Sequence, residues 1–328
     1  MVIAEVHERH LKWAGKDAGI VIPTWIRGHV PLPRGPAVIK DSRIKRIHRR
    51  IRQHELSWEL TRDPENFEHF YNRMCVPYSK ARFGEGAFIF SKENVRAIFD
   101  RGELLLVNKG GEHIAGQLID YRNKKSASIP LLGLLDANAE FVSMGALAAG
   151  YEFTLQHLEK NGHRSVGFGQ SQAFLKDGVL QFKKSFGHVI SSSNELKYVV
   201  NFLSDTPAAR AFLKNNPLIF ERSDGLRGAI FIGGAEPTVE MLAEAYKNYF
   251  HPGLVELLVV SLASEDDGGL KPGEVPSEFS MPTKELQQSG MDCRWLAKDE
   301  CDVLIGPLGA LPIAGAVAIR PRLTSSVQ

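Results

Sequence analysis

The sequence predicts a mixed α/β protein with more than one compact core. Its 328 residues exceed the roughly 250–300 residues at which a single hydrophobic core stops growing. Over residues 57–203, segments with helical periodicity alternate with strand-like segments, and three closely spaced strand candidates stand at their centre. A long amphipathic helix leads from the last of these strands to a further strand. The connection allows parallel pairing beside antiparallel pairing in one mixed sheet.

The composition is that of an ordinary globular protein. Hydrophobic residues make up 43%, charged residues 24%, and the net charge of +2 excludes a global electrostatic case for nucleic acid or membrane binding. Cys75, Cys293 and Cys301 show neither metal-ligand spacing nor a disulfide framework, and the histidines are scattered, so we expect no metal. The N-terminus lacks a signal-peptide core, and no stretch approaches about 18 apolar residues. We therefore expect a cytoplasmic protein without a membrane span.

Residues 1–56 precede the mixed sheet as an N-terminal segment of their own. We expect residues 1–40 to be irregular and residues 42–52 to form a helix with one isoleucine stripe. The basic side chains of this helix fit either a site for phosphates or an acidic partner, or a solvated face of a packed helix. They are Arg43, Lys45, Arg46, Arg49, Arg50 and Arg52.

Two helices are expected between the first strand, at residues 57–61, and the central strands. Asp63 followed by proline predicts the start of the first helix, which we expect to end before Pro77. Residues 77–87 then predict a loop, and Ser91 predicts the N-cap of the second helix.

The three central strand candidates form a meander. They cover Glu103–Asn108, His113–Arg122 and Lys125–Leu135, and the turns between them are so short that they require antiparallel pairing. Their apolar runs are long, which indicates that both faces of the sheet are covered.

The helix after the meander is the most regular element of the chain. Its apolar stripe runs from Met144 to Leu158, and Asn161-Gly162 predicts its end. Arg164–Phe168 then predicts a short buried strand, expected to pair in parallel with an earlier one. A polar helix or turn segment runs to Gly187 and is followed by strand candidates at His188–Ser192 and Leu196–Leu203.

Residues 204–328 predict a small C-terminal α/β domain of unknown role. The helices are expected at residues 207–214, 237–250 and 283–288, the strands at 228–232, 255–262, 291–296 and 302–305, and a mobile loop at 263–282.

The element order over residues 57–203 is similar to the GNAT acyltransferase fold, and the local sequence resembles the FemAB-type, BioF-like branch of that superfamily. Three segments carry the resemblance: PYSKARFG at 77–84, NGHRSVGFGQS at 161–171 and DGVLQFKKSFG at 177–187. The last one ends in the FK-x-x-x-G arrangement of such proteins, here with Lys183 and Gly187. The resemblance covers about half of the chain.

The resemblance implies transfer of an acyl group from an acyl-CoA, acetyl-CoA or longer, to the amine of a small molecule or peptide. Ordinary GNATs bind the coenzyme A pyrophosphate with Gln/Arg-x-x-Gly-x-Gly/Ala at the start of the helix. Residues 141–146, FVSMGA, keep the central Gly145 but lack the leading Gln or Arg. FemAB-type proteins also degrade this motif, and some use aminoacyl-tRNA, so the donor stays open between acyl-CoA and tRNA. A third alternative is a binding protein that retains the fold without catalysis.

A helix N-terminus offers unpaired N–H groups and positive dipole to a phosphate. The candidate donor-binding residues at this helix start are Ser143, Met144, Gly145 and Ala146. The resemblance adds Lys183, whose ammonium suits phosphate. Gly145 could instead serve only as a conformationally permissive residue where a loop joins a helix. Lys183 could instead be one of two adjacent lysines, with Lys184, on a surface turn.

Asp177 and Asp136 are the candidates for a general base, with Glu152 behind them. A carboxylate needs a raised pKa for that role near neutral pH, and each of the three also fits an ordinary structural position. GNAT reactions also proceed without a strong enzymic base. Tyr78 and Arg82 follow the first helix, on the loop that borders the acceptor site in GNATs. Arg82 suits either binding of an acceptor carboxylate or a surface ion pair.

Overall fold

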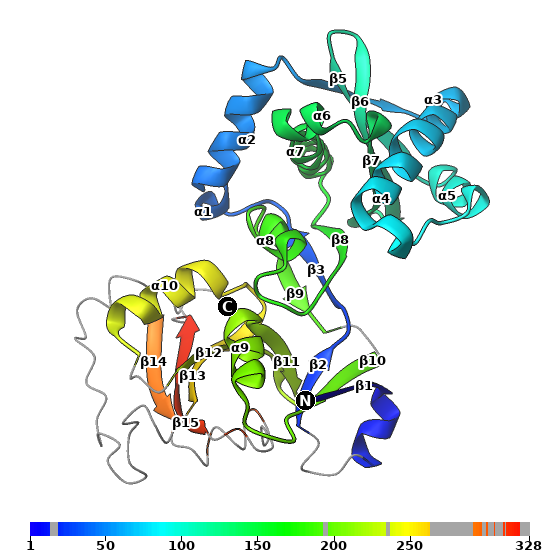
Figure 1. The fold of residues 1–328 in the computed structure, drawn as a ribbon. Helices are drawn as coiled ribbons and strands as arrows, with labels where there is room; N and C mark the ends of the chain where they lie inside the picture. The colour runs from blue at the N-terminus through cyan, green and yellow to red at the C-terminus, as the bar shows by residue number, and fades with distance from the viewer. Residues whose placement is uncertain are drawn as a thin grey trace. The chain divides into compact units, whose positions relative to one another are not determined.

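The computed structural model forms two compact units, drawn in Figure 1. Residues 28–169 and 185–189 form the first, which we call the core unit; residues 1–27, 170–184 and 190–328 form the second, which we call the terminal unit. The sequence predicts domains at residues 1–56, 57–203 and 204–328. The two units divide the chain differently, and those domain ranges stay a proposal. The structure describes residues 1–13, 19–192, 196–233, 237–262, 291–296, 300, 305, 311 and 313–321.

The core unit is built on a mixed sheet of the order β4-β5-β6-β7-β8-β3-β9. The predicted meander is confirmed, since β5, β6 and β7 pair antiparallel in sequence order. The interior residues of β5 and β6 are buried, so both faces of the sheet are covered, as their apolar runs predict. The strands are β3 (Ile26–Pro31), β4 (Ser57–Thr61), β5 (Glu103–Lys109), β6 (Glu112–Asn123), β7 (Ser126–Leu134), β8 (Ser165–Ser171) and β9 (Val189–Ser191).

Helices cover the two faces of this sheet. Phe67 and Phe70 pack with Leu104, Leu106 and Leu118, which share one face of β5 and β6. α7 (Ala146–Lys160) approaches the other face, because its Gly150 lies against the side chains of Val107 and Gln117. A Cβ at Gly150 would lie 3.2 Å from the Gln117 amide, so this glycine serves close packing.

The helical segment after β4 is longer than the sequence predicts. α3 (Pro64–His69) continues through a π-helical turn, η2 (Phe70–Cys75), into α4 (Val76–Phe83), so the expected loop at residues 77–87 is wrong as far as Phe83. Pro77 is the second residue of α4 and directly follows the π-helical turn, so the change in helical hydrogen bonding coincides with the residue that lacks an N–H. The proline therefore begins a helical segment. α5 (Lys92–Phe99) starts as predicted at its Ser91 cap.

Gly145 separates the helix after the meander into α6 (Ala139–Met144) and α7, which ends at Asn161 as predicted. The basic segment forms α2 (Ser42–Gln53), preceded by the single turn α1 (Pro36–Ile39).

The expectation of irregular structure over residues 1–40 is wrong. β1 (Val2–His7) and β2 (Ile20–Pro23) pair antiparallel with β10 (Leu196–Asn201), and η1 (Glu8–Trp13) lies between them. β3 joins the sheet of the core unit beside β8. These strands are decided by partners far along the chain, which local patterns do not register.

The terminal unit contains a mixed sheet of the order β11-β12-β13-β15-β14. β12 and β13 pair in parallel and are connected through a helix, which repeats the connection from β7 through α7 to β8. β11 and β15 were missed by the sequence reasoning. The helix at 283–288 and the loop at 263–282 lie outside the described residues, and Ile305 alone is described of the strand at 302–305. The elements are α8 (Gly178–Lys184), α9 (Pro207–Asn215), β11 (Leu218–Arg222), β12 (Gly225–Gly233), α10 (Val239–Tyr249), β13 (Leu254–Leu262), β14 (Met291–Leu296) and β15 (Ile313–Pro321).

The predicted fold class is confirmed: a mixed central sheet with an additional C-terminal α/β sheet. No helix in the described part of the chain has the length and apolar character needed to cross a bilayer.

Candidate functional site

β7 and β8 of the core unit separate shortly after they begin to pair. Their parallel register joins Ser126 to Ser165 and ends at Ser128 with Gly167, although β7 continues to Leu134. The corresponding pair of the terminal unit, β12 and β13, stays together from Leu226 to Gly233. An opening between parallel strands, beside the helix that connects them, is therefore a property of the core unit.

Gly145 forms the joint at which α7 begins. Its φ of 84° is left-handed, which glycine adopts without strain, and its N–H closes α6 on the carbonyls of Phe141 and Val142. Ala146 is fully buried, whereas Ser143 is exposed and donates its hydroxyl to the Glu140 carbonyl at 2.7 Å. The first N–H groups of α7 have no intrahelical acceptors, so they supply the positive end of the helix dipole.

Arg50 of α2 lies directly against this joint. A Cβ built on Gly145 would lie 3.2 Å from Arg50 Cδ and 3.5 Å from Arg50 Nη1. The guanidinium thus stands at the start of α7, where the leading Gln or Arg of the GNAT motif is missing. Sequence reasoning left the basic residues of α2, Arg50 among them, open between a site for phosphates or an acidic partner and a solvated face. The spacing of three residues from buried Ile47 was the signal that Arg50 faces inward.

Tyr78 and Arg82 lie on α4, and Arg82 Nη1 donates to the Tyr78 hydroxyl. Both residues influence the pKa of buried Tyr151 of α7. Burial, as the main cause, and Tyr78 raise the pKa of the Tyr151 phenol, and Arg82 opposes them without reversing the upward direction. The Tyr151 ring packs on Phe168 of β8, with centroids 4.8 Å apart. The structure therefore brings the two acceptor candidates to the neighbourhood of α7 and β8.

Asp136 follows β7 and has a left-handed backbone, with φ 49° and ψ 25°. Arg73 of η2 binds its carboxylate in a bidentate arrangement, with 2.7 Å between Nε and Oδ1 and a second bond from Nη2 to Oδ2. The hydrogen bond and the charge of Arg73 lower the pKa of Asp136. A lowered pKa weakens a carboxylate as a base, so the predicted catalytic role would need the Arg73 contact to open.

Asp177 and Lys183 belong to the terminal unit, so they do not share a unit with Gly145. Asp177 Oδ1 accepts from the Leu180 N–H at 2.7 Å, which places it at the start of α8. The Lys183 ammonium is buried and donates to the Gln170 carbonyl at 2.7 Å and to Ser171 Oγ at 3.0 Å. Their predicted roles in catalysis and donor binding stay predictions.

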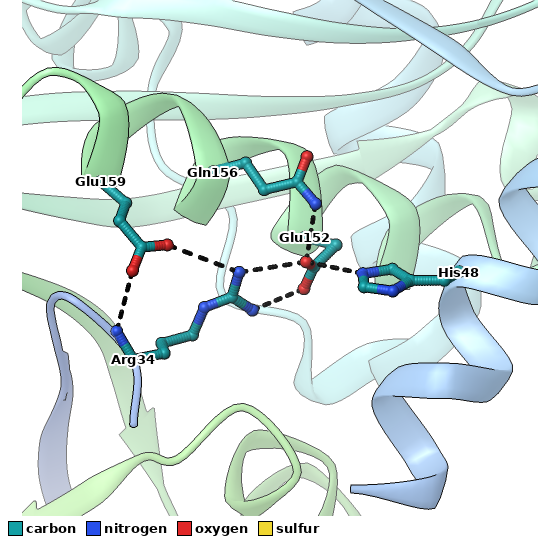
Figure 2. Close-up of polar contacts among 5 residues, drawn as sticks. All are labelled: Arg34, His48, Glu152, Gln156 and Glu159. Atoms are coloured by element: carbon teal, nitrogen blue, oxygen red, sulfur yellow. Dashed lines mark hydrogen bonds and ion pairs between the residues drawn. The ribbon is translucent and has the colours of Figure 1, made fainter. Parts of the chain in front are cut away.

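A buried ionic cluster connects the N-terminal part of the core unit to α7 (Figure 2). Glu152 stands at its centre with 1% of its side chain exposed, and Arg34 binds it through both terminal nitrogens at 2.6 and 3.0 Å. His48 of α2 and Gln156 reach the same carboxylate at 2.9 and 2.8 Å. Sequence reasoning missed this cluster because Arg34 lies in a proline-rich stretch with no periodic pattern.

The cluster holds Glu152 ionised. Burial alone would raise the pKa of this carboxyl, but the hydrogen bonds and charge of Arg34, together with hydrogen bonds from His48 and Gln156, hold its pKa below the ordinary value. Glu152 is consequently a weak base. Glu152 belongs to α7 and is hydrogen-bonded to His48 of α2, so this contact holds α2, and with it Arg50, against α7.

The outer face of α2 forms a shallow depression of about 550 Å³, lined by four basic side chains and one serine. No ion pair joins these side chains to a carboxylate in the described part of the structure. The lining residues are Ser42, Lys45, Arg46, Arg49 and Arg52.

The element order, mixed sheet and separating parallel pair of the core unit are similar to the GNAT acyltransferase fold, as the sequence resemblance implies. No family model and no curated protein matches the chain. Similar solved structures include L-PGS from Bacillus licheniformis, with 14% identity, a TM-score of 0.39 and coverage of 60% of this chain and 66% of that chain. FemX is similar at 12% identity and a TM-score of 0.44, again with 60% of this chain and 66% of that chain covered.

An aminoglycoside acetyltransferase from an uncultured soil metagenomic sample, in complex with sisomicin, is similar at 16% identity and a TM-score of 0.32. That match covers 48% of this chain and 99% of the acetyltransferase. The chain spans between half and two thirds of the length of the first structures that it matches.

Proposed function

We propose that this chain is an N-acyltransferase that moves an acyl group from an acyl-CoA, acetyl-CoA or longer, to an amine. The observation that carries the proposal is the separation of β7 from β8 beside the N-terminus of α7. An elongated ligand in such an opening would meet free backbone groups and the positive end of a helix dipole. We also propose that the protein is cytoplasmic and that the transfer uses no metal ion.

The proposed donor site lies at the start of α7. Gly145 permits close approach of a pyrophosphate to the backbone, and Arg50 supplies the cation that the motif itself lacks. Because Arg50 covers buried Gly145, its side chain would turn to meet the phosphates. Lys183 stays a proposed donor contact. The other proposed contacts at this helix start are Ser143, Met144 and Ala146.

The proposed acceptor is the amine of a small molecule or peptide, which Tyr78 and Arg82 would border. Arg82 is exposed on α4, so its guanidinium could bind a carboxylate of the acceptor. Asp136 and Asp177 stay the proposed carboxylates of catalysis, with Asp136 next to the end of β7.

The basic depression of α2 favours a second candidate, a FemAB-type transferase that uses aminoacyl-tRNA. Four cations without described carboxylate partners line one face of a helix that is anchored to α7. Such a face suits a phosphate backbone, and its binding would weaken with salt. A binding protein without catalysis is the remaining candidate if neither donor binds.

Calorimetric titration with acetyl-CoA, coenzyme A and bulk tRNA tests these candidates. Arg50→Gln should weaken coenzyme A binding about tenfold or more, because a charge-assisted hydrogen bond contributes about 1.5–3 kcal/mol. Arg52→Gln on the outer face is the matched control and should leave coenzyme A binding unchanged. If acetyl-CoA does not bind the wild type, the acyl-CoA proposal is refuted. Salt-dependent tRNA binding lost in Arg49→Gln would then support the second candidate.

A further inference from the structure

A pocket of about 810 Å³ lies within the terminal unit. It is formed by η1, by β2 and β10 of the three-stranded sheet, and by the hairpin of β11 and β12. The volume suits a small molecule. Its charged lining residues are Glu8, Lys197, Glu221, Arg222, Asp224 and Arg227.

The charges of this pocket are sorted by depth. The side chains of Lys197 and Arg227 are only 3% and 5% exposed. The carboxylates reach further toward solvent, since Glu221 is 24% exposed, Asp224 is 60% exposed and Glu8 is exposed as well. Positive charge is therefore concentrated in the interior of the pocket, and negative charge lies toward its mouth.

The ammonium of Lys197 has more hydrogen-bond donors than the protein uses. Lys197 lies on β10, the central strand of its sheet, and donates to the Glu221 carboxylate. Within the described residues Glu221 is its only partner, whereas an ammonium carries three N–H donors. A buried charged donor without an acceptor is unfavourable. The pocket is therefore where the remaining acceptors have to come from, either as water or as a ligand.

Arg222 gives a second and independent indication of an anion. It is the last residue of β11, and burial first and then the charge of Arg227 lower the pKa of its guanidinium, although Asp224 opposes the change. Arginine stays protonated in proteins, so its charged form is held here against burial and repulsion. An anion between the two guanidinium groups would weaken that repulsion.

The carboxylates next to these cations are already engaged in ion pairs. Arg227 binds Asp224 through both terminal nitrogens at 2.6 and 2.7 Å, and its Nε donates to buried Glu256 at 2.7 Å. The hydrogen bond from Arg227 is the main reason that the pKa of Asp224 falls to about 2, so this carboxylate stays ionised. Glu221 is paired with Lys197 in the same way. A ligand would thus add to a preformed network.

We propose that this pocket binds the oxyanion of a small molecule, a carboxylate or a phosphate, through the Lys197 ammonium and the Arg222 guanidinium. Both side chains donate hydrogen bonds to the anion, and Arg227 adds positive charge nearby. The exposed carboxylates Glu8 and Asp224 disfavour a polyanion such as a nucleic acid, because many of its charges would meet the mouth at once. The site lies wholly within the terminal unit and does not depend on the proposed acyl transfer.

Binding is tested by NMR titration of the full chain with sodium phosphate and with sodium acetate, each at an ionic strength kept constant with sodium chloride. We expect saturable shifts of the backbone amides of Ser223 and Asp224 with at least one of the two probes. A response to phosphate alone identifies a phosphate ligand, and a response to acetate alone identifies a carboxylate. No saturable shift with either probe, or shifts confined to the amides around Gly145, would overturn the proposal.

Substitutions then locate the anion. Arg222→Gln and Lys197→Met should each weaken binding about tenfold, which corresponds to about 1.4 kcal/mol. Arg222 is only half-buried at the end of its strand, so Arg222→Gln keeps the test open even where Lys197→Met fails to fold. Arg294→Gln, at an exposed position of β14 outside the pocket, is the matched control and should bind as the wild type does. Unchanged affinity in Arg222→Gln would place the anion elsewhere and refute the site.

Discussion

Replacement of Glu152 by glutamine should strongly destabilise the core unit. The substitution keeps the shape of the side chain but removes the negative charge that faces Arg34, and the two side chains are only 1% and 4% exposed. Breaking a buried ion pair by removing one partner costs about 3–5 kcal/mol, and the remaining carboxylate of Glu159, 3.8 Å from Arg34 Nη2, places the loss toward the lower end of that range. At about 2–4 °C per kcal/mol for a unit of this size, the melting temperature should fall by roughly 6–20 °C.

The matched control is Asp136→Asn, which removes a bidentate arginine pair of similar geometry on the surface. Its side chains are 55% and 51% exposed, so the loss should lie between about 0 and 1 kcal/mol. Chemical denaturation followed by fluorescence, together with thermal unfolding, measures both variants. Equal losses in the two variants, or a loss below about 1 kcal/mol for Glu152→Gln, would refute the view that burial gives this cluster its strength.

The pH dependence of the difference has a defined sign. The pKa of Glu152 is lowered in the folded state from its ordinary value of 4.5, so its contribution to stability is present above that value and is lost as pH falls through the lowered value. The difference between wild type and Glu152→Gln should therefore be largest near neutral pH and shrink in acid. A difference that stays constant between pH 7 and pH 3 would contradict this linkage.

Three further predictions concern separate parts of the chain. Lys183→Met should destabilise the terminal unit by about 1.5–3 kcal/mol, because the Gln170 carbonyl loses a charged donor; faster amide exchange around Gln170 and Ser171 would report it, and unchanged exchange would contradict it. Gly145→Ala should lower the stability by about 1 kcal/mol because residue 145 has a left-handed backbone. It should also weaken acetyl-CoA binding, which calorimetry measures. Unaltered stability and affinity together would contradict the role given to Gly145 between α6 and α7. Burial raises the pKa of the Cys75 thiol to about 11, so mass spectrometry should find it unlabelled by iodoacetamide at pH 8 until denaturant is added, whereas labelling of the native protein would show that the thiol is accessible.

Elements with strong local signals were predicted correctly from the sequence. The meander follows from apolar runs joined by very short turns, and α7 follows from its apolar stripe and from Asn161-Gly162. Asp63 and Ser91 cap their helices in the structure as their residue types predict. In each case, the residues that decide the conformation are neighbours in the chain.

Elements that depend on distant partners were missed. β1 and β2 exist because β10 pairs with both across most of the chain, and the five-residue strand β11 exists because it pairs with β12. Pro77 was interpreted as a helix end, although the π-helical turn before it allows a new helical segment to begin there. Strand pairing and helix continuation are free-energy differences set by the whole unit, so single-residue preferences decide them poorly.

By itself the sequence determined the alternating elements of the core unit, the break at Gly145 and the missing Gln or Arg before it. Only the tertiary structure decided where the compensating charge stands, because Arg50 reaches the start of α7 from another helix. The same holds for Arg34 with Glu152 and for Arg73 with Asp136, since the residues of each pair are separated by more than 60 residues in the chain. Electrostatic interactions depend on distance and burial in space, and a one-dimensional pattern records neither.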